Sequence, residues 1–157
     1  MIDESMIFSK ACKYFPDGDR GLSPYTRLHG FTHQDIESSL HKANRETLCG
    51  ILVEGQDGLA NLEEIVEVKG IDLIYLGLFD ICQSLGLPGQ VNHPDVLFEV
   101  DRCQKLIQSN SIAAGSMSTD INYINKLLEK NYQFIAYLND SAALRAYFDT
   151  ELSKINK

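Results

Sequence analysis

The sequence has few basic residues, no tryptophan and no low-complexity segment or linker. The shortage of basic residues argues against two classes of partner. Only 14 basic residues stand against 22 acidic ones, which gives a formal net charge of −8. A nucleic-acid-binding surface needs a basic face that replaces counterions. Anionic membranes likewise attract basic segments. The charge therefore argues against both nucleic acid and membrane as partners.

Long hydrophobic runs and paired cysteines are also missing. The longest apolar stretch, residues 71–79, contains Asp72 and falls far short of the roughly 20 residues of a membrane span. The beginning, MIDESMIFSK, has early acids and no long apolar region, so it does not resemble a signal peptide. No CxxC pair is present, which argues against a zinc site. We predict a cytoplasmic protein with reduced cysteines, of which Cys49 and Cys103 are buried.

What is present indicates one globular α/β domain over residues 1–157. Hydrophobic residues make up 44% of the chain and charged residues 23%. Two helical segments come first, and four apolar segments follow, each with a helix after it. Near-continuous apolar strands are typical of parallel sheets that helices cover on the outside. The predicted strands are 47–53, 71–78, 111–116 and 133–138, and the predicted helices are 3–15, 32–44, 58–68, 94–108, 120–130 and 141–155.

Two acidic residues mark the ends of the first two predicted strands. Glu54 follows the first strand and Asp80 follows the second. A right-handed crossover makes consecutive parallel strands neighbours, roughly 4.8 Å apart, so the two carboxylates would repel each other without a cation between them. Mg²⁺ or Mn²⁺ suits such a site, and the small Gly55 and Gly77 would let a ligand approach the backbone. The alternative is that Asp80 is only a helix N-cap.

Several stretches together resemble the HpcH/HpaI aldolase/citrate lyase family, the metal-dependent class II pyruvate aldolases. The resemblance extends from about residue 1 to about residue 150. The stretches that carry it are YFPDGDRG (14–21), ILVEG (51–55), NLEEIVEVKGIDLIYLGLFD (61–80), SLGLPGQVNHPDV (84–96) and FIAYLNDSAAL (134–144).

The resemblance implies a TIM barrel and a reaction. By analogy with the family, Glu54 and Asp80 would bind Mg²⁺ or Mn²⁺, and the backbone amides of Phe79 and Asp80 would hold the carboxylate of pyruvate. The implied reaction splits a 4-hydroxy-2-oxo acid into pyruvate and an aldehyde. The sequence departs from the family pattern in three ways. Leu52 replaces a polar residue, and Gly55 replaces a threonine. The family's Gly-Pro-x-Asp-Leu-Ser is here GLFDIC, residues 77–82.

The chain is shorter than members of that family and matches only the later four strands of their barrel. MIDE resembles the tail of the fourth barrel strand, so Met1 would be an internal methionine of a longer relative. The family's catalytic histidine and its pyruvate-binding arginine fall in the unmatched half, and no catalytic residue is assigned here. The histidines of this chain do not stand at the matching position; they are His29, His33, His41 and His93.

Two further residues match family positions, and for each we favour a structural role. Arg20 would pair with Asp17, Asp19 or backbone carbonyls, and His93 would position the helix that begins near Pro94. For the whole chain, the alternative to an aldolase is a catalytically inactive half-barrel. Its open sheet would pair with itself, as a homo-oligomer, with a complementary half-barrel or with a full-length aldolase. An unrelated doubly wound α/β binding domain is a third possibility.

Overall fold

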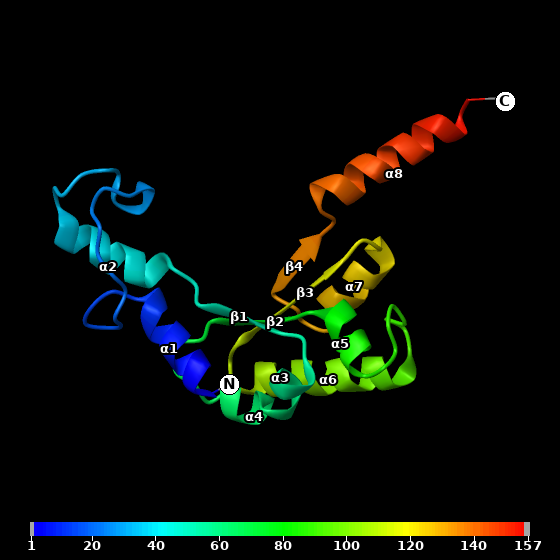
Figure 1. Ribbon diagram of the computed structural model, residues 1–157, viewed down its shortest axis with the longest axis horizontal. Helices are drawn as coiled ribbons and strands as arrows, with labels where there is room; N and C mark the ends of the chain where they lie inside the picture. Colours follow the sequence, from blue (N-terminus) through cyan, green and yellow to red (C-terminus); the bar gives the residue numbers. More distant parts are fainter. Residues whose placement is uncertain (1, 156–157) are drawn as a thin grey trace.

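The computed structural model describes residues 2–155, and these contain four parallel strands joined by helices (Figure 1). The strands form one sheet in the order β1-β2-β3-β4. Their bounds are β1 Gly50–Val53, β2 Leu73–Leu76, β3 Ala113–Ser118 and β4 Phe134–Tyr137. The helices are α1 Ile2–Cys12, η1 Arg27–His29, α2 Ile36–Glu46, α3 Gln56–Ala60, α4 Leu62–Ile65, α5 Leu78–Ser84, α6 Pro94–Ser109, α7 Ile121–Glu129 and α8 Asp140–Ser153.

The strand order decides between two of the predicted architectures. Consecutive strands are neighbours and all pair in parallel, as in a segment of a (βα) barrel. A doubly wound sheet would reverse its order at a switch point, and no reversal occurs within residues 2–155. The prediction of an incomplete barrel of about four strands is confirmed, and the doubly wound alternative is wrong.

One face of the sheet carries the hydrophobic core. The side chains of Ile74, Leu76 and Ala114 are fully buried there, under α6 and the short helices of the crossovers. Val96 and Ile107 contribute fully buried side chains from α6. This covered side is called the outer face below, because it corresponds to the outside of a barrel.

The opposite face, here called the inner face, has no covering layer among residues 2–155. Leu52, Tyr75, Gly115 and Phe134 lie opposite one another in register, so they form one row across the four strands. Leu52 is 54% exposed and Phe134 is 47% exposed. The ring of Tyr75 contacts that of Phe134 edge to face, with centroids 6.1 Å apart. This row is the position of the side chains that fill a closed barrel.

The first helix differs from its prediction in its bounds and in the side chains that it buries. It begins at Ile2, so Ile2–Glu4 are helical rather than the end of a strand, and Met1 lies outside the described residues. Met6, Ile7 and Phe15, which are apolar residues of the predicted helix 3–15, are exposed, and Ser5 and Ser9 are buried instead. The reason is a close contact: Ser9 donates a hydrogen bond of 2.7 Å to the carbonyl of Lys69, and its oxygen occupies the space beside Gly70.

Other boundaries shift by a few residues, and one predicted helix is broken. Residues 58–68 form two short helices that meet at Asn61, whose side chain donates to the carbonyl of Asp57. The helix that the N-cap alternative placed after Asp80 begins earlier, at Leu78, which was the last residue of the predicted strand 71–78, and forms α5. Cys49 and Cys103 are fully buried, as predicted. In the part of the chain that the structure describes, we find no helix with the length and apolar character needed to cross a membrane.

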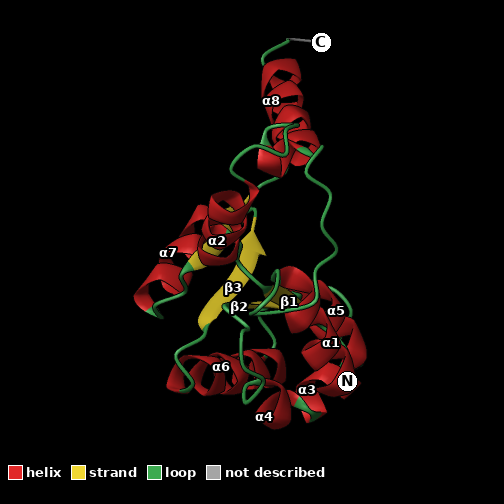
Figure 2. Cartoon of the chain, turned by 90° about the vertical axis from the view of Figure 1, so that its left-hand side faces the viewer, coloured by secondary structure: helices red, strands yellow, loops and turns green. Residues whose placement is uncertain are grey.

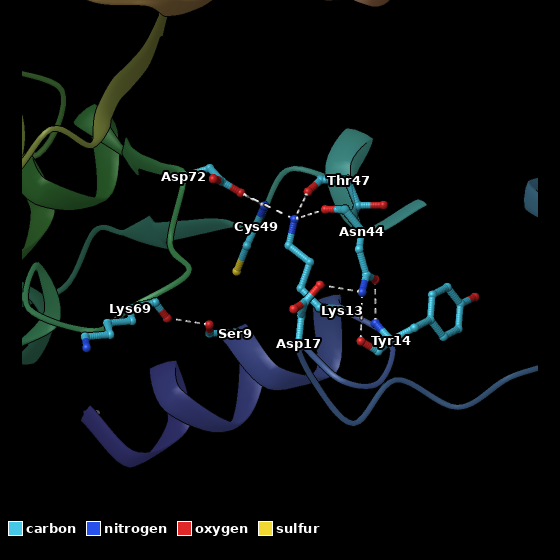
Figure 3. A network of polar contacts seen from close by, with 9 residues as sticks. All are labelled: Ser9, Lys13, Tyr14, Asp17, Asn44, Thr47, Cys49, Lys69 and Asp72. Carbon is cyan, nitrogen blue, oxygen red and sulfur yellow. Dashed lines mark hydrogen bonds and ion pairs between the residues drawn. The ribbon is translucent and has the colours of Figure 1, made fainter. Parts of the chain in front are cut away.

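A polar network ties the segment before β1 to the amino end of the sheet (Figure 3). Lys13 donates hydrogen bonds to the carbonyls of Asn44 and Thr47, and its Nζ lies 4.0 Å from Asp72. The buried Asn44 side chain bonds the backbone N–H and C=O of Tyr14, at 2.7 and 2.8 Å. Asp72 accepts from the amide of Cys49 at 2.8 Å, just before β1. In barrels this end of the strands serves stability, and the carboxyl end serves function.

Candidate active site

Glu54 lies on the inner face at the carboxyl end of β1. It is the residue after Val53, which pairs with Leu76, so it stands opposite Gly77 in the continuing register. A Cβ atom added to Gly77 would meet both Cβ and Oε2 of Glu54 at 2.7 Å. The side chain of Glu54 therefore lies directly over Gly77, where any larger residue would displace it.

Asp80 belongs to the element that begins at the same point. The N-cap of α5 is Gly77, and Asp80 lies in the first turn of this helix. Asp80 is thus not the helix N-cap, and Glu54 is not one either, because the N-cap of α3 is Gly55. The prediction that Asp80 is only a helix N-cap is therefore wrong. Glu54 and Asp80 thus follow the carboxyl ends of two adjacent parallel strands, and Gly77, which Glu54 overlies, lies three residues before Asp80.

The start of α5 supplies a second feature. The first amides of a helix lack intrahelical acceptors, and the helix dipole places partial positive charge there. Phe79 and Asp80 carry such amides, and the side chains of both residues are exposed. One turn of chain therefore offers the carboxylate of Asp80 and free backbone donors, and the strand beside it ends at Glu54. Such groups are suitable for a hard cation beside a small anion.

A donor set of two carboxylates fits some metals and excludes others. Among residues 2–155 no group of three or more His, Cys, Asp or Glu side chains is placed to hold a metal ion. Mg²⁺ and Mn²⁺ are held through one or two carboxylates, with water or substrate completing the shell. A structural zinc site, which needs four protein ligands, is not formed by these residues.

Gln56 is a positioning residue that the sequence analysis missed. Its Nε2 donates a hydrogen bond of 2.6 Å to the carbonyl of Ser84, at the end of α5. This bond ties the loop that carries Glu54 to the helix that carries Asp80. The signal was weak, because a glutamine two residues after an acid has no distinctive spacing. The role of Gly77 was also misjudged, since Glu54 itself, rather than a ligand, occupies the space beside it.

The remaining predicted residues have structural contacts. His93 is the N-cap of α6: its Nδ1 accepts from the amide of Asp95 at 3.3 Å, which agrees with the positioning role. Arg20 stacks on the ring of Tyr14 at 5.0 Å, a structural contact with a different partner from those predicted. The buried His29 lies between the hydroxyls of Tyr14, at 3.0 Å, and Ser39, at 2.6 Å.

Comparisons with known proteins identify the family. The sequence profile of the HpcH/HpaI aldolase/citrate lyase family matches residues 3–146. The chain belongs to this family. It is 35% identical over 143 residues to the hydroxypyruvate/pyruvate aldolase of Roseobacter denitrificans, covering 90% of this chain and 55% of the relative. It is 31% identical to the 2-keto-3-deoxy-L-rhamnonate aldolase of Klebsiella pneumoniae, covering 91% and 53%. The chain thus spans about half the length of the curated relatives it matches.

Solved structures show the same relation in three dimensions. An HpcH/HpaI aldolase/citrate lyase family protein from Burkholderia cenocepacia superposes with a TM-score of 0.88 at 24% identity, covering 98% of this chain and 61% of that one. A citrate synthase named SbnG gives a TM-score of 0.83 at 20% identity, covering 97% and 58%. These neighbours have TIM-barrel-type folds, and this chain has the fold of about half of such a barrel.

Proposed function

We propose that this chain forms the metal- and pyruvate-binding part of a carbon–carbon lyase, which splits a 4-hydroxy-2-oxo acid into pyruvate and an aldehyde. The observation that carries the proposal is Glu54 lying over Gly77 at the start of the helix that bears Asp80. Family membership and the aldolase names of the relatives support it. The four free cysteines support a reducing compartment such as the cytoplasm.

Each residue then has a defined part in binding. The carboxylates of Glu54 and Asp80 would hold Mg²⁺ or Mn²⁺, which supplies Lewis-acid stabilisation of the enolate that carbon–carbon cleavage generates. The amides of Phe79 and Asp80 would receive the carboxylate of pyruvate and orient it. Leu52 and Tyr75, on the inner face below Glu54, would form the apolar floor of the pocket.

General acid–base chemistry is not assigned to a residue of this chain. His29 is buried in hydrogen bonds to two hydroxyls, and His93 caps α6. The proposed reaction therefore requires groups from a second polypeptide segment that completes the barrel. This requirement separates metal binding, which the chain would perform alone, from turnover, which it would not.

Metal binding is tested by thermal unfolding with and without millimolar Mn²⁺ or Mg²⁺. At a hundredfold excess over Kd, the ion would stabilise the fold by about 2.7 kcal/mol, or a Tm increase of about 5–10 °C. Asp80→Asn should abolish this increase, and Asp57→Asn, in α3, is the matched control that should keep it. An equal metal response in wild type and Asp80→Asn, or none in either, would mean that the two acids form no metal site.

Turnover is tested by pyruvate release from a 4-hydroxy-2-oxo acid in the presence of Mn²⁺. We expect background rates for the chain alone. Activity should rise when a complementary half of a related aldolase is added, and Glu54→Gln should remove that increase. If the mixture stays inactive although the metal response is present, the chain binds metal without serving as an aldolase subunit.

The uncovered inner face favours a second candidate function, that of a catalytically inactive interaction subunit. Leu52 and Phe134 expose about half of their surface, as expected for residues that a partner covers. The two functions differ in one measurement, because an inactive subunit would associate with its partner identically with and without divalent metal.

A further inference from the structure

We propose that the groove between α6 and α7 binds a small aliphatic monocarboxylate, through residues other than Glu54 and Asp80. The cavity in this groove has a volume of about 210 Å³. One water molecule takes up roughly 30 Å³, and pockets for drug-sized ligands begin at roughly 300 Å³. The size of the cavity therefore suits a compound of a few carbon atoms.

The groove is formed by elements in the middle of the chain. α6 and α7 both pack against β3, which has a neighbouring strand on each side (Figures 1 and 2). Two contacts join the helices at the end of α7. Gln104 of α6 donates a hydrogen bond of 2.9 Å to the carbonyl of Lys130, and the ammonium of Lys130 lies 2.5 Å from the carboxylate of Asp101. The shape of the groove thus rests on contacts within the described residues.

Tyr132 supplies an unsatisfied polar group to this cavity. It lines the cavity and is 4% exposed, and its hydroxyl has no hydrogen-bond partner among residues 2–155. Burial, and then the nearby Tyr123 and Asp101, raise the pKa of this phenol. Both neighbours line the same cavity, so the hydroxyl belongs to the side of the ring that faces it. A buried hydroxyl without a partner is costly, and a ligand that accepts its proton in a hydrogen bond would remove that cost.

The charges around the cavity favour an anion. Lys130 is neutralised by Asp101, whereas Lys126, one turn earlier on α7, makes no ion pair within the part of the chain that the structure describes. Burial raises the pKa of Tyr123 as well as that of Tyr132, so both phenols remain hydrogen-bond donors at neutral pH. One unpaired ammonium and two phenol donors match one carboxylate, which accepts several hydrogen bonds.

The rest of the lining selects the class of anion. Leu97 and Val100 of α6 and Leu127 of α7 provide apolar walls, against which a short aliphatic chain would pack. Phosphate has only polar oxygens, which gain nothing from such walls. The carboxylate of Asp101 would also repel a second negative charge on the ligand. The cavity therefore favours a monocarboxylate over phosphate or a dicarboxylate.

An NMR titration of the ¹⁵N-labelled chain with butyrate, in EDTA to remove divalent ions, tests the proposal. We expect saturable shifts of the amide signals of α6 and α7, with a millimolar Kd. Butyramide has a similar shape without the charge and should bind about tenfold more weakly. Lys126→Gln should weaken butyrate binding by a similar factor. Lys105→Gln, an exposed change on α6, is the matched control that should leave the Kd unchanged.

Tyr132→Phe tests the hydroxyl itself, because it removes the unpaired group and keeps the ring. Without butyrate, we expect this variant to have a higher Tm than the wild type, since no buried donor is left unsatisfied. With butyrate, its Tm should rise less than that of the wild type. A lower Tm without butyrate, together with an unchanged response to it, would show that the hydroxyl has a structural partner and no part in binding.

Four further outcomes would overturn the proposal. The groove is not the site if butyrate causes no saturable shifts in α6 and α7, or shifts only the amides of Phe79 and Asp80. Equal affinities for butyrate and butyramide would show a cavity that does not select an anion. Tighter binding of inorganic phosphate would rule out the monocarboxylate class, and equal weakening by Lys126→Gln and Lys105→Gln would indicate a general effect of charge. Glu54→Gln should leave butyrate binding unchanged, so a failure of the aldolase proposal is distinguishable from a failure of this one.

Discussion

The two faces of the same four-stranded sheet differ sharply in how their apolar residues are covered. On the outer face Ile74 and Leu76 are fully buried beneath helices, whereas Leu52 on the inner face is 54% exposed. Both faces are apolar, and they alternate along the same strands. A sheet that faced water on one side would alternate apolar with polar residues. The inner face is thus built for burial, and its burial has to come from outside the described residues.

The largest expected effect contrasts one residue from each face. Ile74→Ala opens a cavity in the outer core and should lower the free energy of unfolding by about 2–5 kcal/mol at any protein concentration. Leu52→Ala should cost less than about 0.5 kcal/mol at low concentration, because its side chain is already half exposed. Urea unfolding at two protein concentrations measures both. A concentration-independent loss of several kcal/mol in Leu52→Ala would contradict the distinction between the faces.

A smaller effect is expected where the inner face meets the candidate site. Gly77→Ala would place a methyl group 2.7 Å from Cβ and Oε2 of Glu54, and should destabilise the fold by about 1–3 kcal/mol as Glu54 moves. It should also remove the response of Tm to Mn²⁺. Gly55→Ala is the matched control, because its new Cβ would have no neighbour within 4 Å. If Gly77→Ala keeps the full metal response, Glu54 is not a ligand.

The sequence predicts the outer face well, because the information is local to each strand. The apolar run around Ile74 indicates a strand buried in a parallel sheet, and the structure confirms it. The same rule does not extend to Tyr137, which lies in the predicted strand 133–138 and is 51% exposed. Tyr137 lies on the last strand, with no neighbour beyond it within residues 2–155. Its burial depends on a partner strand, and hydrophobicity alone does not reveal whether one is present.

The candidate site can likewise be predicted from the sequence only in part. The types and places of Glu54 and Asp80 indicate a cation site, and their family match adds a reaction. The contact between Glu54 and Gly77 depends on the register of β1 against β2, which pairs Val53 with Leu76. A shift of one residue would turn Glu54 to the outer face. Nothing in the sequence sets that register by itself; the pairing of the whole sheet does.

The smallest of the three effects concerns a thiol within the covered side. Burial raises the pKa of Cys103, on α6, from 9.0 to about 12. The folded state therefore holds its proton to higher pH than the unfolded chain does. The stability that this group contributes is complete below pH 9 and is lost as the pH rises toward 12, with about 1.4 kcal/mol lost by pH 10.

Cys103→Ala should remove this part of the alkaline loss, measured as the difference in urea midpoint between pH 8 and pH 10. Val100→Ala, a buried change on the same helix without a thiol, should lower stability equally at both pH values. If Cys103→Ala keeps the full alkaline loss, ionisation of this thiol does not limit the outer face, and the groups that do would have to be sought among the raised pKa values of Cys49 and Tyr132.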